Sequence, residues 1–232
     1  MADRSHDSGS LQSREFKQIE MQRAVIYIAR PWINRSIEKH LGGSYSADAI
    51  GQLIWNGWWS YNQLRKDVSR ESTAGARIMV ELAVVSEAFY LELLKHENSK
   101  ENAIDQFNLI AWDIYERMGR LAWWITGFGS KNEFDHLRKS IMAFRSFPFG
   151  SPSYLWKDLP AEKGTVAFNC ERCPVANYFK EKDLADFGFS TWCKYDYRMA
   201  ELWGGKLELT NTIAGGAEVC DFKWTAKQLH LI

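Results

Sequence analysis

Cysteine and carboxylate side chains in the last third of the chain have the types and spacing that chemistry on a small molecule requires. Cys173 directly precedes Pro174. Proline is favoured at the first position of a helix, so the pair predicts a helix with Cys173 as its N-cap. Unpaired backbone N–H groups and the helix dipole would lower the thiol pKa there, and the neighbouring Arg172 would add to this effect. The local sequence leaves equally open an ordinary buried cysteine at a strand–helix junction.

Cys193 and Asp196 form a second pair of this kind. They stand three residues apart in a stretch that predicts a helix, so both side chains would lie on one helix face. A thiol and a carboxylate on one face can act as nucleophile and base, or can hold a ligand through hydrogen bonds. The alternative is a structural role for Asp196, in which its charge complements the dipole at the helix N-terminus.

Metal binding is another chemistry that cysteines can support. Cys170 and Cys173 form a C-x-x-C pair, but a zinc ribbon needs a second such pair, and Cys193 and Cys220 each stand alone. We therefore expect no metal and no cofactor. A zinc site built from Cys173, Cys193, Cys220 and a carboxylate is the alternative. The five histidines show no metal-ligand spacing.

Cys220 and Asp221 lie in an alternating run, 217–224, that is typical of a β-strand. Alternation places Cys220 on the same face as Phe222 and Trp224, which predicts a core face and a packing role for this cysteine. Asp221 points to the opposite face. The sequence leaves open whether Asp221 is a pocket acid or a solvent-exposed residue.

The elements around these residues indicate an α+β fold. Residues 1–14 are polar and are expected to form a disordered tail. Residues 15–147 show helical periodicity and are expected to be a helical part. Residues 148–232 follow a turn-rich joint and predict an α+β module that carries the site, in one compact unit with the helical part.

Within the helical part, the first helix is expected from Glu15 to His40, with an interruption at Pro31 and with Ile28 on its apolar face. Further helices are expected at about 47–66 and 75–94. Asn98 and Ser130 each have a glutamate three residues on, which predicts capping boxes at the starts of two later helices.

The C-terminal module alternates between strand and helix patterns. Glycine pairs and apolar alternation mark its elements. We expect a strand at 165–169, a helix from Pro174 to Lys182, a break at Phe187-Gly188, a helix from Trp192 to Trp203, and a β-hairpin formed by 206–210 and 217–224.

Composition excludes several classes of protein. The 232 residues carry 29 basic and 29 acidic side chains, and a chain of zero net charge lacks the basic surface that nucleic acids require. No apolar run is long enough to span a membrane, and the polar start has no secretory signal. We therefore expect reduced thiols and a cytoplasmic protein. Eleven Trp and 13 Phe predict a large aromatic core or an aromatic-walled pocket.

Four motifs follow one another between Cys173 and Trp224. Their order and spacing resemble the C-terminal signature of the L-2-amino-thiazoline-4-carboxylic acid hydrolase family, and the apolar stretch 75–94 fits the family more loosely. The motifs are Cys-Pro-Val-Ala-Asn-Tyr-Phe-Lys at 173–180, Cys-Lys-Tyr-Asp-Tyr at 193–197, Leu-Glu-Leu-Thr-Asn-Thr-Ile-Ala-Gly-Gly at 207–216 and Cys-Asp-Phe-Lys at 220–223.

The resemblance implies a hydrolase that opens the ring of a cyclic amidine, converting L-2-amino-thiazoline-4-carboxylate to a carbamoyl-cysteine in L-cysteine formation. Water or a thiolate would attack the amidine carbon, and the adduct would expel the ring nitrogen, the ring sulfur or ammonia. Asp196 would act as base or as anchor for the amidinium, whose two N–H groups suit a carboxylate. The residues implied are Cys173, Cys193 and Asp196 for catalysis, and Asn211, Thr212, Cys220 and Asp221 for substrate binding.

Two further points follow from the resemblance. Asn211 stands where many members carry arginine, which would change how a substrate carboxylate is held. The family is also distantly similar to the vinyl-4-reductase ligand-binding domain, an α+β module with a helix pair and a curved antiparallel sheet. Some of those domains hold zinc through cysteines, so the resemblance keeps the zinc alternative open.

Two other functions remain as alternatives. One is a non-catalytic, sensor-like module that binds a small molecule in the same pocket. The other is a hydrolase of another small heterocycle, which the departure at Asn211 keeps open. The expected partner is in each case a small molecule, and the sequence leaves a homo-oligomer open.

Overall fold

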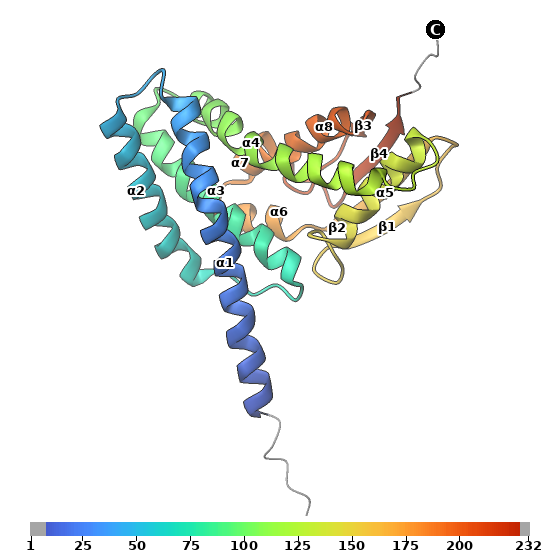
Figure 1. Cartoon of the computed structure of the whole chain (residues 1–232), viewed down its shortest axis with the longest axis horizontal. Helices are drawn as coiled ribbons and strands as arrows, with labels where there is room; N and C mark the ends of the chain where they lie inside the picture. Colours follow the sequence, from blue (N-terminus) through green and yellow to red (C-terminus); the bar gives the residue numbers. More distant parts are fainter. Residues whose placement is uncertain (1–7, 228–232) are drawn as a thin grey trace, which may run out of the picture.

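The computed structural model describes residues 8–227, with side chains described from Ala24 on. Helices precede and interrupt a four-stranded sheet, which makes the fold α+β (Figure 1). The elements are α1 (Ser8–Leu41), α2 (Ala47–Leu64), the 3₁₀ helix η1 (Arg65–Asp67), α3 (Ala74–His96), α4 (Lys100–Gly127), α5 (Glu133–Ser146), β1 (Leu155–Leu159), β2 (Thr165–Arg172), α6 (Pro174–Glu181), α7 (Ala185–Ser190), α8 (Trp192–Leu202), β3 (Gly205–Leu209) and β4 (Cys220–Ala226).

Helices α1 to α4 form a bundle around α3, and α6 and α7 complete its core. α3 is buried along most of its length because neighbouring helices cover it on several sides. Ring contacts connect the layers: Tyr90 of α3 stacks on Phe187 of α7 with ring centroids 4.1 Å apart. Figure 1 shows this bundle at one end of the molecule, with the N-terminal half of α1 extending away from it.

The sheet lies at the other end and is antiparallel throughout, in the order β1-β2-β4-β3. A second core lies between the sheet and helices α4, α5 and α8. β3 alternates between buried and exposed side chains, as expected for a strand with one face on a core and one in solvent. The second core therefore lies on one face of the sheet.

Polar contacts join helices α6 and α8 to the bundle. Trp203, just after α8, donates its indole N–H to the carbonyl of Gly119 in α4 at 3.0 Å. The Tyr178 hydroxyl of α6 donates to the buried carboxylate of Glu87 in α3. Buried polar groups require such partners, so these contacts fix how α6 and α8 sit on the bundle.

The first helix differs from its sequence-based prediction. α1 already begins at Ser8, so residues 8–14 are helical, and residues 1–7 lie outside the described residues. Pro31 lies inside α1 and does not interrupt it. The proline removes one helical hydrogen bond, and its exposed position lets water replace that bond. Ile28 is 67% exposed, while Ile26 is buried in the core.

The predicted helix starts also differ by one or two residues. Ser99, not Asn98, caps α4 and accepts from the Asn102 N–H at 3.1 Å. Asn132, not Ser130, caps α5. Each true cap lies directly before its helix and is itself a side chain able to cap, so sequence spacing alone did not distinguish the neighbours.

In the C-terminal part, the strand at 165, the helices at 174 and 192 and the hairpin are confirmed. The expected break at Phe187-Gly188 is wrong, because both residues lie in α7. β1 was not predicted, since its run Leu155–Leu159 is mostly exposed and lacks apolar alternation.

No helix in residues 8–227 is long and apolar enough to cross a membrane. Even the buried helix α3 carries charged side chains that the bundle covers, namely Arg77, Glu81, Glu87 and Glu92.

The α2–α3 contact depends on Gly57. A Cβ atom at this position would come within 2.4 Å of the Phe89 ring, whereas a Cβ at Gly51 in the same helix meets nothing within 4 Å. We expect Gly57→Ala to lower the free energy of unfolding by about 1–3 kcal/mol through overpacking. Gly51→Ala should raise it by up to about 1 kcal/mol through helix propensity. Urea unfolding of both variants tests this, and equal effects of the two substitutions would contradict the close packing at Gly57.

A cysteine- and aromatic-lined cavity as candidate active site

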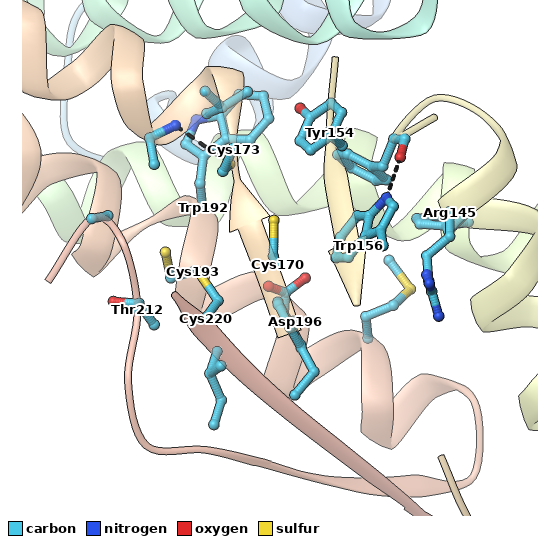
Figure 2. Close-up of a pocket in the computed structure, with 18 of the residues that line it drawn as sticks. Arg145, Tyr154, Trp156, Cys170, Cys173, Trp192, Cys193, Asp196, Thr212 and Cys220 are labelled. Atoms are coloured by element: carbon cyan, nitrogen blue, oxygen red, sulfur yellow. Dashed lines mark hydrogen bonds between the residues drawn. The ribbon is translucent and has the colours of Figure 1, made fainter. Parts of the chain in front are cut away.

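A cavity of about 120 Å³ lies between the sheet and helices α5, α6 and α8 (Figure 2). All four cysteines of the chain line it, together with Asp196 and Thr212. Most of the remaining wall is aromatic, so the polar groups inside it lie in a poorly solvated environment. The aromatic residues are Tyr115, Phe144, Phe149, Tyr154, Trp156, Phe168, Phe179, Trp192, Trp203, Phe222 and Trp224.

Cys173 caps α6 as the sequence predicted, and its Sγ accepts a hydrogen bond from the Ala176 N–H at 3.5 Å. The predicted lowering of its pKa is wrong. Burial raises the pKa of Cys173 to about 11, although the backbone N–H groups of Ala176 and Val175 act in the opposite direction. Desolvation of a thiolate outweighs two hydrogen bonds here. The thiol is therefore neutral at physiological pH.

Arg172 acts on the thiol in the expected direction, but its own partners lie elsewhere. Its guanidinium forms a bidentate ion pair with Glu71, with distances of 2.7 and 3.0 Å, and also donates to the Ser153 carbonyl. It thereby ties the end of β2 to the segment before α3 and to the turn before β1. Arg172 lowers the pKa of Cys173, but less than burial raises it.

Cys193 and Asp196 share one face of α8, as their spacing predicted, and both line the cavity. Burial raises the pKa of Asp196 to about 7 by desolvating its carboxylate, and no hydrogen bond from the described residues offsets this effect. Burial and the nearby Asp196 together raise the pKa of Cys193 well above its ordinary value, and Thr212 hydrogen-bonds to this cysteine. Asp196 is thus the group in the cavity that changes charge near neutral pH.

Cys170 and Cys220 face each other across β2 and β4. Each sulfur is engaged with the backbone: Cys170 donates to the Arg172 carbonyl, and Cys220 accepts from the Ile213 N–H, both at 3.2 Å. Burial raises the pKa of Cys220 to about 12. Cys220 packs in the second core and also lines the cavity.

Asn211 and Asp221 do not line the cavity. The Asp221 carboxylate accepts hydrogen bonds from the backbone N–H groups of Thr210 and Asn211 and from the Asn211 side chain, at 2.6 to 2.8 Å. These bonds hold the loop after β3 against β4. The structure therefore separates these two predicted binding residues from Thr212 and Cys220, which do line the cavity.

Two polar residues of the cavity were missed by the sequence analysis. Tyr154 is 1% exposed and its hydroxyl has no hydrogen-bond partner among the described residues. Arg145 of α5 lies over the rings of Phe168 and Trp156, at 4.5 and 5.2 Å from their centroids. Neither residue belongs to a motif, and only the aromatic density of 144–156 marked this segment.

Comparison with protein families gives one match. The family model for L-2-amino-thiazoline-4-carboxylic acid hydrolase matches residues 77–224, which is more than half of the chain.

The chain belongs to this family.

The match extends across every residue that lines the cavity, from Tyr115 to Trp224, and omits α1 and α2. The cavity therefore lies wholly within the part that the hydrolase family shares. No curated protein sequence matches the chain. Among solved structures, the crystal structure of the Fe(II) unliganded H-NOX protein from K. algicida is similar at 10% identity and a TM-score of 0.32, covering 86% of this chain and 97% of that chain.

The residues present do not fit a zinc site. Within the described part of the chain, no group of three or more His, Cys, Asp or Glu side chains is arranged to hold a metal ion. Although the four cysteines of this hydrolase-family protein line one cavity, the sulfurs of Cys170 and Cys220 are directed into backbone hydrogen bonds.

The raised pKa of Asp196 makes stability depend on pH. An unfolded chain loses this proton near pH 4, whereas the folded protein keeps it until about pH 7. The free energy of unfolding should therefore fall between pH 4 and 7, by on the order of 1 kcal/mol per pH unit from this group. Asp196→Asn removes the effect, so the free energy of unfolding of the variant should increase relative to that of the parent protein as pH rises.

Urea unfolding between pH 4.5 and 8 measures this difference. Asp135→Asn serves as the control, because hydrogen bonds from Lys139 and Lys131 lower the pKa of Asp135 to about 2, so its contribution should not change over this range. A flat difference for Asp196→Asn would mean that its carboxyl ionises normally.

Most substitutions of core residues lower the free energy of unfolding, but removal of the Tyr154 hydroxyl should not. A buried hydroxyl without a partner destabilises the fold, so Tyr154→Phe should leave the free energy of unfolding unchanged or raise it by about 1 kcal/mol. Tyr178→Phe is the matched comparison, because that hydroxyl donates to buried Glu87, and its loss should cost about 1.5–3 kcal/mol. Equal losses in thermal or urea unfolding would show that the Tyr154 hydroxyl has a partner.

Proposed function

We propose that this protein hydrolyses the ring of L-2-amino-thiazoline-4-carboxylate to a carbamoyl-cysteine. Asp196 carries the proposal: it is a carboxylate with a pKa of about 7 on the wall of an aromatic cavity, and it makes no hydrogen bond to the described residues. A carboxylate in this state can hold an amidinium through two N–H groups or can accept a proton near neutral pH. Membership of the hydrolase family supports the substrate class.

The proposed reaction uses water as the nucleophile. The water oxygen bonds to the amidine carbon while the Asp196 carboxylate takes one of its protons. The neutral adduct that forms from the amidinium still carries the hydroxyl. It collapses to a carbonyl as the hydroxyl proton passes to water and the bond from this carbon to the ring nitrogen or to the ring sulfur breaks. Protonated Asp196 returns its proton to the leaving atom. The first route gives S-carbamoyl-cysteine and the second N-carbamoyl-cysteine.

The cysteines are assigned a different role from the nucleophilic one first expected. Burial raises the pKa values of Cys173, Cys193 and Cys220 above their ordinary value, so few of these thiols are thiolates at neutral pH. A neutral thiol is a weak hydrogen-bond donor that packs like a small apolar side chain. We propose that Cys173 and Cys193 shape the cavity beside Asp196 and contact the ring of the substrate.

A small-molecule-binding module is the second candidate. The neutral thiols and the aromatic walls favour it, because both serve binding without catalysis. The distant similarity of the family to the vinyl-4-reductase ligand-binding domain, expected from the sequence, agrees with it as well. A hydrolase of a related heterocycle would use the same groups.

Mass spectrometry of the purified protein with L-2-amino-thiazoline-4-carboxylate tests the proposal. We expect a carbamoyl-cysteine whose isomer identifies the broken bond, and a kcat/KM that rises as pH increases through about 7, because the base must be ionised. Asp196→Asn should lower kcat by about 100-fold or more, whereas Asp135→Asn, outside the cavity, should not.

The remaining outcomes separate the alternatives. A covalent substrate adduct on the intact protein would make a cysteine the nucleophile. Loss of turnover with a chelator would point to a metal. Ligand binding detected by thermal shift without turnover would favour the binding module. If the protein shows no binding and no turnover, this heterocycle is excluded as its ligand.

A further inference from the structure

Arg145 places a cation in the wall of the cavity. It extends from α5, and its side chain is 11% exposed. Its guanidinium lies over the rings of Phe168 and Trp156, which also line the cavity. An arginine can take such a position because its planar, weakly hydrated head stacks on aromatic rings. The aromatic wall thus fixes the position of the positive charge.

The cavity wall therefore has two opposite charges, and among the described residues that line it these come from Asp196 and Arg145. Figure 2 shows them apart: Arg145 lies beside Trp156, at the end away from Cys193 and Thr212, with Asp196 between in this view. A small zwitterion, with a cation at one end and an anion at the other, complements this arrangement.

Two nitrogen donors of the Arg145 guanidinium make no hydrogen bond to the described residues. Its Nη1 donates to Asp158 at 2.6 Å and contacts the Met142 sulfur at 4.0 Å. Among the described residues, the buried Nε has no hydrogen-bond partner and Nη2 makes no hydrogen bond. Nε and Nη2 lie on one edge of the guanidinium plane and can hold both oxygens of a carboxylate. Asp158 does not occupy this edge. Its side chain is 73% exposed, and it uses only Nη1, so the Nε and Nη2 donors are left for a ligand.

We propose that Arg145 binds the carboxylate of the substrate through its Nε and Nη2 donors and so selects heterocycles that carry a carboxylate. The inference rests on the proposed function, in which Asp196 meets the amidine end. It assigns the task of carboxylate recognition to α5, whereas the sequence had placed it near Asn211, which lies outside the cavity lining.

The test removes the carboxylate from the ligand and the guanidinium from the protein in turn. L-2-amino-thiazoline-4-carboxylate is compared with 2-amino-2-thiazoline, which lacks the carboxylate, in the parent protein and in Arg145→Met. We expect Arg145→Met to lower kcat/KM for the carboxylate by about 10- to 100-fold, mainly through KM. It should leave kcat/KM for 2-amino-2-thiazoline within about twofold.

Two further variants keep the result interpretable. Arg138→Met removes another positive charge from α5, where Arg138 is exposed and pairs with Asp135. It should leave kcat/KM unchanged for both ligands. Arg145→Lys retains the charge but loses the two-donor edge, and it should give a partial loss for the carboxylate alone. Melting temperatures of the free proteins report whether Arg145→Met is folded. If it is unfolded, Arg145→Lys decides.

The outcomes distinguish failure of the role of Arg145 from failure of the proposed function. Equal losses for the two ligands, or no loss for the carboxylate, would overturn the role of Arg145 while turnover by the parent protein upholds the hydrolase. Binding of the carboxylate without turnover would overturn the hydrolase. The role of Arg145 would then be tested by the dissociation constants of the two ligands. The parent protein should bind the carboxylate more tightly than 2-amino-2-thiazoline, and Arg145→Met should abolish this preference. If the parent protein binds neither ligand, both proposals fail.

Discussion

Exclusion of water from one aromatic-walled cavity is the constraint on which the chemistry of this protein depends. The same desolvation raises the pKa of Asp196 towards neutrality and keeps the surrounding thiols protonated. A carboxylate in water would be ionised throughout the physiological range, and a thiol capping a helix in water would be easier to ionise. Burial thus reverses the expected roles: the acid becomes the titrating group, and the cysteines become neutral walls.

The cavity exists because two cores meet along it. The helical bundle forms one core and the sheet with α5 and α8 forms the other, and residues such as Cys173 and Phe149 pack against both. Ionic and hydrogen-bond contacts across the boundary, above all Arg172 with Glu71, hold the end of β2 against the bundle. The family match begins at Arg77, near the start of α3, and ends in β4, so it includes most of both cores. The site is therefore a property of their junction rather than of the C-terminal part alone.

Local sequence predicted features that local physics controls. The N-cap at Cys173 follows from Pro174, and the shared face of Cys193 and Asp196 follows from their spacing in α8. The hairpin of β3 and β4 follows from alternation and glycines. Predictions failed where neighbours in space decide, as at Pro31, whose exposed position allows α1 to continue, and at Phe187-Gly188, which lies in α7 in the bundle core rather than in a break.

The sequence by itself determined the α+β class, most helices of the chain, and the family, because periodicity, capping and ordered motifs are local properties. Only the tertiary structure decided which groups share the cavity. It placed Arg145, Tyr154 and Asp196 in the lining of one cavity and directed Asn211 and Asp221 towards each other outside it. It also set the protonation of the thiols. The reason is that burial and desolvation depend on every element packed around a side chain, and residues far apart in sequence supply those elements.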